Sequence, residues 1–229
     1  MDASVKKSMH EYYDVHARDY DRVYAGQFPG SELVGADAYP EDAAALREVI
    51  ARSAKGALLD VPCGTAFWLS VYAPSVTSAV LIDQSERMLG EARARAHALG
   101  VDAKCRFAKV DIVSEPWPAG RFDTLLVGFF LSHADSTDES AFFERARSAL
   151  APGGTVIILD SIWNEGRAQS KPKESVVRRS STDGRSFDVY KRFFDADDMT
   201  QMAARYGLVA TVAYAGRAFI AAVVTVGSR

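Results

Sequence analysis

The stretch "LLDVPCGTAFW", residues 58–68, is the part of the chain that decides the fold. An apolar run reaches Asp60, and a turn containing Pro62 and Gly64 follows at once. This pattern is typical of a buried strand that turns into a helix. A glycine in such a turn allows a ligand to approach the backbone closely, because glycine carries no side chain.

Strands and helices alternate on the C-terminal side of this turn, and two helices are expected before it. Alternation of this kind indicates βαβ units, and hence a mainly parallel sheet with helices on both faces. We expect helices at Ser4 to about Ala25, 41–54, 66–72, 85–100 and 138–154, and strands at 57–61, 78–83, 104–111, 122–130 and 155–161.

After Asp160 the pattern changes to a polar, basic segment, residues 161–194, with an Asp183-Gly184 turn signal between two short extended runs. It is interpreted as an inserted hairpin. A helix at 195–207 and strands at 208–216 and 218–226 follow. Because a tight turn joins these two strands, they must be antiparallel. The sequence therefore predicts an α/β fold with a seven-stranded, mostly parallel sheet and an antiparallel last strand.

Length and composition fit one soluble domain over residues 1–229, with 48% hydrophobic and 25% charged residues. A net charge of −3 argues against a nucleic-acid partner. No apolar run is long enough for a membrane span, and the first residues lack a signal peptide, so we expect a cytoplasmic protein. Cys63 and Cys105 show no metal-ligand spacing, and no metal site is expected.

Four acidic or polar positions fall at the ends of predicted strands. They are Asp60, Asp83, Asp111 and the segment 130–133. Any one of them is also explained as a helix or loop cap. In open parallel sheets, however, ligands bind outside the carboxyl ends of the strands. Four such positions in register therefore predict one ligand site along this edge.

These residues resemble the class I S-adenosylmethionine-dependent methyltransferases, which share a Rossmann-like fold. The glycine motif of that family, acid-x-G-x-G-x-G, corresponds here to Asp60, Pro62, Gly64 and Ala66, so only the central glycine is kept. The resemblance implies that S-adenosylmethionine is the cofactor, with S-adenosylhomocysteine as product. It implies that Gly64 approaches the methionine moiety and that Asp60 acts near its amino group. A plain strand-to-helix turn is the alternative for this motif alone.

The same resemblance assigns the other strand ends to the nucleoside. Asp83 would accept hydrogen bonds from both ribose hydroxyls, and its two oxygens suit a vicinal diol. Met88 would pack on the adenine, or simply belong to the core. Asp111 would take the adenine amino group. The full set of expected cofactor-binding residues is Tyr13, Tyr20, Asp60, Gly64, Asp83, Gln84, Met88, Asp111, Ile112 and Phe129.

A nicotinamide-dependent dehydrogenase is the main competing interpretation, because the spacing from Gly64 to Asp83 approximates its fingerprint. Two of its glycines are absent, an acid follows the third strand, and the chain ends in a hairpin. These three features argue against it.

Residues 1–40, and "MHEYYDVHARDYD" in particular, resemble the N-terminal cover of small-molecule methyltransferases. By that resemblance Tyr13 and Tyr20 close over the cofactor. An amphipathic helix packed on the sheet would give the same pattern. Aromatic walls that exclude water are expected from Phe67, Trp68, Phe129, Phe130 and Trp163.

A more specific resemblance, to the phosphonate O-methyltransferase type of dehydrophos biosynthesis, comes from "GTAFWL", "FFLSHADSTDESAFFERARSALAPGG" and "VVRRSSTDGRSFDVYKRFF". It implies that Arg179 and Lys191 point into an acceptor pocket beside the hairpin. Because strand residues alternate in direction, Arg178 and Arg179 cannot both do so. Arg185 is a further candidate. A solvated basic hairpin is the alternative.

The predicted function is O-methylation of a small anionic metabolite, a phosphonate or carboxylate of secondary metabolism, by in-line displacement. Its expected catalytic residues are His133, Arg179 and Lys191. His133 is a base, a hydrogen-bond donor or a structural histidine. The alternatives are a neutral phenol, amine or carbon acceptor with His133 as base, and a non-catalytic cofactor-binding protein. We expect no partner beyond a small molecule, and a monomer or homodimer.

Overall fold

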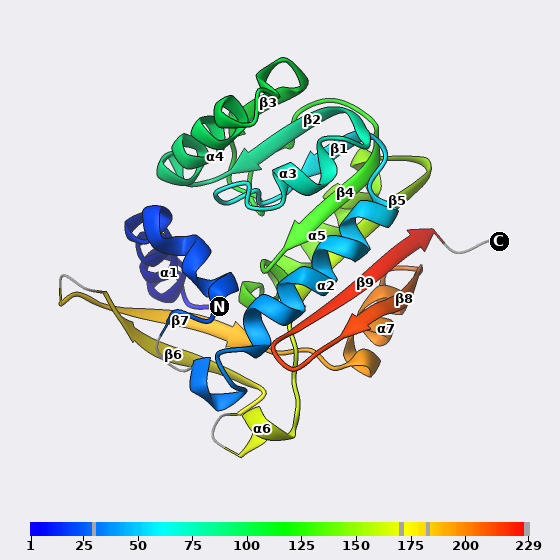
Figure 1. The fold of residues 1–229 in the computed structure, drawn as a ribbon. Coiled ribbons are helices and arrows are strands. Elements are labelled where there is room, and N and C mark those ends of the chain that lie inside the picture. The colour runs from blue at the N-terminus through cyan, green and yellow to red at the C-terminus, as the bar shows by residue number, and fades with distance from the viewer. Residues whose placement is uncertain (29–30, 170–171, 182–183, 227–229) are drawn as a thin grey trace.

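A seven-stranded sheet forms the centre of the computed structural model, which describes residues 1–28, 31–169, 172–181 and 184–226 (Figure 1). Its strand order is β3-β2-β1-β4-β5-β9-β8. Neighbouring strands from β3 to β5 are parallel, and β9 is antiparallel to both β5 and β8, as predicted. The strands are β1 (Gly56–Asp60), β2 (Val76–Asp83), β3 (Cys105–Lys109), β4 (Phe122–Gly128), β5 (Leu150–Ser161), β8 (Leu208–Ala215) and β9 (Phe219–Val226).

Helices cover both faces of the sheet because its central strands are apolar on both sides. Leu58 belongs to the core cluster on one face, and its neighbour Leu59 belongs to the cluster on the other. The first cluster includes α2, α3 and α4, and the second includes α5 and α7. These helices are α2 (Ala38–Ser53), α3 (Leu69–Tyr72), α4 (Glu86–Ala98), α5 (Ser136–Ala149) and α7 (Ala196–Arg205).

The inserted segment forms a separate two-stranded antiparallel sheet of β6 (Glu174–Ser180) and β7 (Ser186–Arg192). The expected hairpin is therefore present, whereas Asp183 of its turn lies outside the described residues. Helix α1 (Ala3–Val15) packs against β7 beside the carboxyl ends of β2 and β4 (Figure 1). The backbone N–H of Asp188 donates to Ser8 Oγ at 2.8 Å, which fixes the register between them.

Several predicted helix boundaries are wrong. The helix expected from Ser4 to Ala25 ends at Val15, where His16 Nδ1 bonds the carbonyl of Tyr12 at 2.8 Å and a 3₁₀ segment, η1 (Ala17–Ala25), takes over. The helix expected from residue 66 begins only at Leu69, because Ala66 has φ 54°, outside the right-handed helical region. The helix expected to reach residue 154 gives way to β5 at Leu150.

The remaining elements are short. Within the described part of the chain, no helix has the length and apolarity of a membrane span. The short elements are η2 (Ser31–Leu33), η3 (Asp102–Lys104), η4 (Leu131–His133) and α6 (Glu165–Ala168).

Candidate active site

A cavity of about 320 Å³ lies where the carboxyl ends of the parallel strands meet α1 and η1. Asp60, Asp83 and Asp111 line this one cavity, and His133 does too. Trp163, expected in its wall, does not line it, and neither do Arg179 and Lys191. The other expected cofactor-binding residues also line the cavity: Tyr13, Tyr20, Gly64, Gln84, Met88, Ile112 and Phe129. Three of the expected aromatic wall residues line it too: Phe67, Trp68 and Phe130.

The turn after β1 is built around two buried carboxylates. Asp60 is 3% exposed and accepts a hydrogen bond from Tyr72 Oη at 2.9 Å. Asp83 accepts from the backbone N–H of Gly64 at 2.9 Å and of Ser85 at 2.8 Å, which joins the ends of β1 and β2. Burial raises the pKa of Asp60 to about 7 and that of Asp83 to about 6. Both carboxyls thus sit where a cationic or hydrogen-bonding ligand favours ionisation.

Gly64 shows why one glycine of the turn is kept. Its φ is 53°, a left-handed conformation that other residues adopt only with strain. A Cβ at this position would meet nothing within 4 Å, so the turn leaves open space on the side of the cavity.

The raised pKa of Asp60 gives a first prediction, on stability. The unfolded chain has the ordinary value of 3.8, so between about pH 4 and 7 the folded protein holds more protons, and stability falls as pH rises. Asp60→Asn should remove this dependence, because an amide does not titrate in this range, while its oxygen still accepts from Tyr72 Oη. The free energy of unfolding of the variant minus that of wild type should therefore rise by on the order of 2 kcal/mol from pH 5 to pH 8, because one pKa unit corresponds to about 1.4 kcal/mol.

Urea unfolding at the two pH values measures the gain. The exposed Asp197→Asn variant is the control and should show the same difference from wild type at both pH values. An equal difference for Asp60→Asn at pH 5 and 8 would contradict the assignment.

Asp111 has a structural role as well as a place in the cavity wall. Its Oδ1 accepts from the backbone N–H groups of Val113 at 3.0 Å and Ser114 at 3.1 Å. Asp111 therefore caps the loop that follows β3, as the alternative interpretation predicted. Met88 and Ile112, beside it in the wall, are 3% and 2% exposed and also belong to the packed core.

The N-terminal segment is fastened to both cofactor-motif turns. Asp14 accepts from Ser85 Oγ at 2.7 Å, and Asp21 accepts from Thr65 Oγ1 at 2.5 Å. Arg95 of α4 also pairs with Asp21. The sequence interpretation missed these contacts, although a hydroxyl residue follows each strand-end acid. The segment α1–η1 therefore forms the roof of the cavity.

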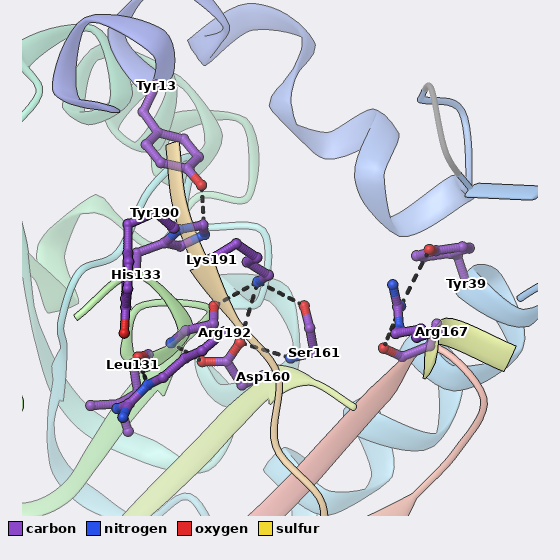
Figure 2. Close-up of polar contacts among 12 residues, drawn as sticks. Tyr13, Tyr39, Leu131, His133, Asp160, Ser161, Arg167, Tyr190, Lys191 and Arg192 are labelled. Carbon is purple, nitrogen blue, oxygen red and sulfur yellow. Dashed lines mark hydrogen bonds and ion pairs between the residues drawn. The ribbon is translucent and has the colours of Figure 1, made fainter. Parts of the chain in front are cut away.

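His133 joins this roof to the hairpin (Figure 2). Its Nδ1 lies 2.7 Å from the carbonyl oxygen of Tyr190, which only accepts, so Nδ1 carries the proton. Its Nε2 then accepts from Tyr13 Oη at 2.6 Å. Burial, with the charges of Lys191 and Arg179, lowers the pKa of His133 well below its ordinary value. The ring is neutral at physiological pH, and the lone pair of Nε2 already accepts the hydrogen bond from Tyr13 Oη.

Lys191 is buried and is not part of the cavity wall. Figure 2 shows it close to His133, with contacts to Asp160 and Ser161. Its Nζ donates to Ser132 Oγ at 2.6 Å and Ser161 Oγ at 2.9 Å, and lies 3.7 Å from Asp160 Oδ1. Burial lowers its pKa to about 7, although Asp160 opposes that shift. Lys191 thus ties β7 to the end of β5 and to the loop that carries His133.

Arg179 is half-buried and points to the interior face of the hairpin, whereas Arg178 points outward with a 74% exposed side chain. The Arg179 guanidinium lies 5.3 Å from the ring centroid of Tyr12 and 3.4 Å from its hydroxyl. Among the described residues, no carboxylate lies within ion-pair distance of it. Its charge opposes the rise in pKa that burial gives Tyr13. Arg185 is exposed and packs over Phe187.

Comparison with known proteins agrees with this architecture. Residues 58–154 match the "Methyltransferase domain" family. Two solved structures, a DhpI-SAH complex and a DhpI-SAM-HEP complex, align at TM-score 0.79 with 26% and 27% identity, covering 100% and 98% of this chain and 100% and 99% of theirs. An S-adenosylmethionine-dependent methyltransferase from Clostridium acetobutylicum shares the fold, at TM-score 0.63 and 17% identity over 95% of this chain and 100% of that one.

Among curated sequences, a ubiquinone/menaquinone biosynthesis C-methyltransferase, UbiE of Dinoroseobacter shibae, is 30% identical over 119 residues. The match covers 51% of this chain and 46% of that protein. The chain therefore spans about half the length of this curated relative.

Proposed function

Because the chain has the fold of the class I S-adenosylmethionine-dependent methyltransferases and a methyltransferase domain at residues 58–154, we propose that it O-methylates a small anionic metabolite. The acceptor is a phosphonate or a carboxylate. The observation that carries this proposal is the half-buried Arg179, which has no carboxylate partner among the described residues and lies beside the roof of the cavity.

The cavity residues fit S-adenosylmethionine. Asp60 offers an ionisable carboxylate to the amino group of the cofactor. Asp83, although each of its oxygens already accepts one backbone N–H, has further lone pairs for the ribose hydroxyls. Asp111 offers an acceptor to adenine between Met88 and Ile112. Bound there, the sulfonium supplies the methyl group. Gln84, Phe129, Tyr13 and Tyr20 complete the enclosure.

The charges around the hairpin favour an anionic acceptor. Arg179 carries the lasting positive charge, because burial lowers the pKa of Lys191 to about 7 and Asp160 Oδ1 lies 3.7 Å from Lys191 Nζ. An anionic acceptor beside Arg179 balances the charge that remains. Arginine binds oxyanions through two parallel hydrogen bonds, and it must hold the spectator oxygens, because binding the attacking oxygen would reduce its nucleophilicity. Alignment and exclusion of water then carry the in-line displacement.

The state of His133 favours the same acceptor class. A phenol or carbon acid needs a base to remove a proton before it attacks, and an amine passes a proton to a base in the course of the transfer. The Nε2 lone pair of His133 accepts from Tyr13, and the pKa of the ring is low, so His133 is a weak base in this arrangement. An acceptor that is already anionic at neutral pH needs no base. His133 instead holds Tyr13 in place.

Arg179→Ala tests the acceptor assignment, with Arg178→Ala as the matched control on the same strand. Arg179→Ala should lower kcat/KM for the anionic acceptor about 10- to 100-fold, as expected for losing charged hydrogen bonds, and leave the affinity for S-adenosylhomocysteine unchanged. Arg178→Ala should behave as wild type. Methyl transfer from labelled cofactor to a panel of phosphonates, carboxylates and neutral acceptors measures both.

Normal turnover of the true acceptor by Arg179→Ala would refute the anion clamp. A bell-shaped pH profile that His133→Ala abolishes would then establish the neutral-acceptor reading. Binding of cofactor without turnover of any acceptor would support the non-catalytic alternative.

A further inference from the structure

Three tyrosines surround Arg179 where the hairpin meets the roof. Burial alone would lower the pKa of Arg179, but Tyr13, Tyr12 and Tyr20 raise it, so all three lie within electrostatic reach of its guanidinium. The Tyr12 hydroxyl accepts from Arg179 Nη1 at 3.4 Å, and the Tyr13 hydroxyl bonds His133 Nε2 at 2.6 Å. The hydroxyls of Tyr12 and Tyr13 are therefore already engaged.

Tyr20 differs from the other two in its position and in its hydrogen bonds. It is half-buried on η1 and lines the cavity, whereas Tyr12 is not among the described residues of the cavity wall. Within the described part of the chain, the Tyr20 hydroxyl has no hydrogen-bond partner. A hydroxyl withdrawn from water loses free energy while it stays unpaired, so this one is suited to bind a polar atom of a ligand.

The aromatic neighbours of Tyr20 place it towards the hairpin. Its ring meets that of Tyr13 edge to face, with 5.9 Å between centroids. The Tyr13 ring meets that of His133 at 5.3 Å, and His133 bonds the hairpin at the carbonyl of Tyr190. The Tyr20 side chain is thus one ring away from the residues that join the roof to the hairpin.

The charges around Tyr20 agree with this position. Burial raises the pKa of Tyr20 well above its ordinary value, and the charge of Arg179 opposes that rise. Burial also raises the pKa of Tyr24, one turn further along η1, but there the nearby charges are those of Asp21 and Asp60. Tyr20 therefore serves the Arg179 side of the cavity, and Tyr24 serves the side of the turn after β1.

The protonation state of Tyr20 decides which kind of ligand atom it can hold. A phenol whose pKa lies well above 10 keeps its proton at neutral pH and can donate it in a hydrogen bond. Arg179 beside it also donates only. Two donors, one of them charged, favour an oxyanion over a neutral group.

We propose that the Tyr20 hydroxyl donates a hydrogen bond to a spectator oxygen of the acceptor anion that Arg179 holds. The proposal rests on the anionic acceptor of the proposed function. In the transfer, the bond between the methyl carbon and sulfur breaks, and its electron pair stays on sulfur. The attacking oxygen forms the new bond to the methyl carbon, and Tyr20 keeps its proton. A phenol acceptor has no second oxygen for Tyr20, so this residue contributes to selection of oxyanions.

Tyr20→Phe tests the proposal because it removes only the hydroxyl. Methylphosphonate and propionate are titrated into the protein loaded with S-adenosylhomocysteine. The variant should bind whichever probe wild type binds about 10- to 100-fold more weakly, as for loss of a hydrogen bond to a charged group, with its affinity for S-adenosylhomocysteine unchanged. Tyr214→Phe removes a hydroxyl that bonds Asp42, away from the described cavity wall, and should bind as wild type.

Two calorimetric results would overturn the proposal. One is wild-type affinity of Tyr20→Phe for the probe. The other is a loss of affinity for S-adenosylhomocysteine alone, which would assign the hydroxyl to the cofactor.

Turnover distinguishes a contact with the acceptor from a structural role. Tyr20→Phe should raise KM for the anionic acceptor more than it lowers kcat. Its loss in kcat/KM and that of Arg179→Ala should combine to less than their product in the double variant, because both residues hold the same anion. Losses that simply multiply would refute the shared site.

The same experiments separate this proposal from the proposed function. If Arg179→Ala is impaired while Tyr20→Phe is not, only the assignment of Tyr20 fails. If wild type binds neither probe and methylates no anionic acceptor, the proposed function itself fails.

Discussion

Replacing Asp83 with alanine is expected to weaken S-adenosylmethionine binding about 10- to 100-fold, the range for loss of hydrogen bonds to a charged group. The effect has two sources. The variant loses the carboxylate proposed to hold the ribose, and it releases the N–H groups of Gly64 and Ser85, which that carboxylate orders. Calorimetry with S-adenosylhomocysteine measures the loss.

Two further variants accompany this test, one intermediate and one control. Asp83→Asn keeps one acceptor oxygen and should lose less affinity than Asp83→Ala. Asp102→Ala removes an exposed acid at the opposite end of β3 and should bind as wild type. If Asp83→Ala bound S-adenosylhomocysteine with wild-type affinity, the cofactor would have to lie elsewhere in the cavity.

The second large effect is expected on stability, at Glu139. This side chain is 2% exposed and accepts from Arg205 Nη2 at 2.8 Å and Tyr206 Oη at 3.0 Å, and it pairs with Arg192. It therefore joins α5 to β7 and to the end of α7. Glu139→Ala leaves the largely buried Arg192 without its carboxylate, which should cost about 3–5 kcal/mol in the free energy of unfolding. That is a large part of the stability of an ordinary domain.

Urea unfolding at pH 7 tests this expectation, with Arg205→Ala as control. Arg205 is 55% exposed on the same carboxylate, so its removal should cost about 1 kcal/mol or less. A loss below about 1 kcal/mol for Glu139→Ala would show that the cluster is not a structural junction. Because Arg192 follows Lys191 on β7, a loosened junction should also reduce acceptor turnover.

The sequence predicted the sheet well because its signals are local. Apolar runs ending in Asp60 and Asp83 mark strand ends, and parallel strands bring their carboxyl ends to one edge. The expectation that Asp60, Asp83 and Asp111 face a single cavity follows from this rule and agrees with the structure. Their proposed contacts with the cofactor remain predictions.

What the sequence did not predict depends on contacts between distant segments. The bonds of Asp14 and Asp21 to the two turns join residues 71 and 44 positions apart. The resemblance implied that Arg179 and Lys191 point into an acceptor pocket, but only packing reveals that Lys191 is buried on two serine hydroxyls.

The roof formed by α1 and η1 leads us to expect that exchange of the nucleoside requires movement of the N-terminal segment. Release of the product would then involve opening of the bonds from Asp14 to Ser85 and from Asp21 to Thr65. Those same bonds close on the turns that bear Asp83 and Gly64. The steady-state rate is therefore expected to report release of the demethylated nucleoside, and a rapid first turnover should precede it.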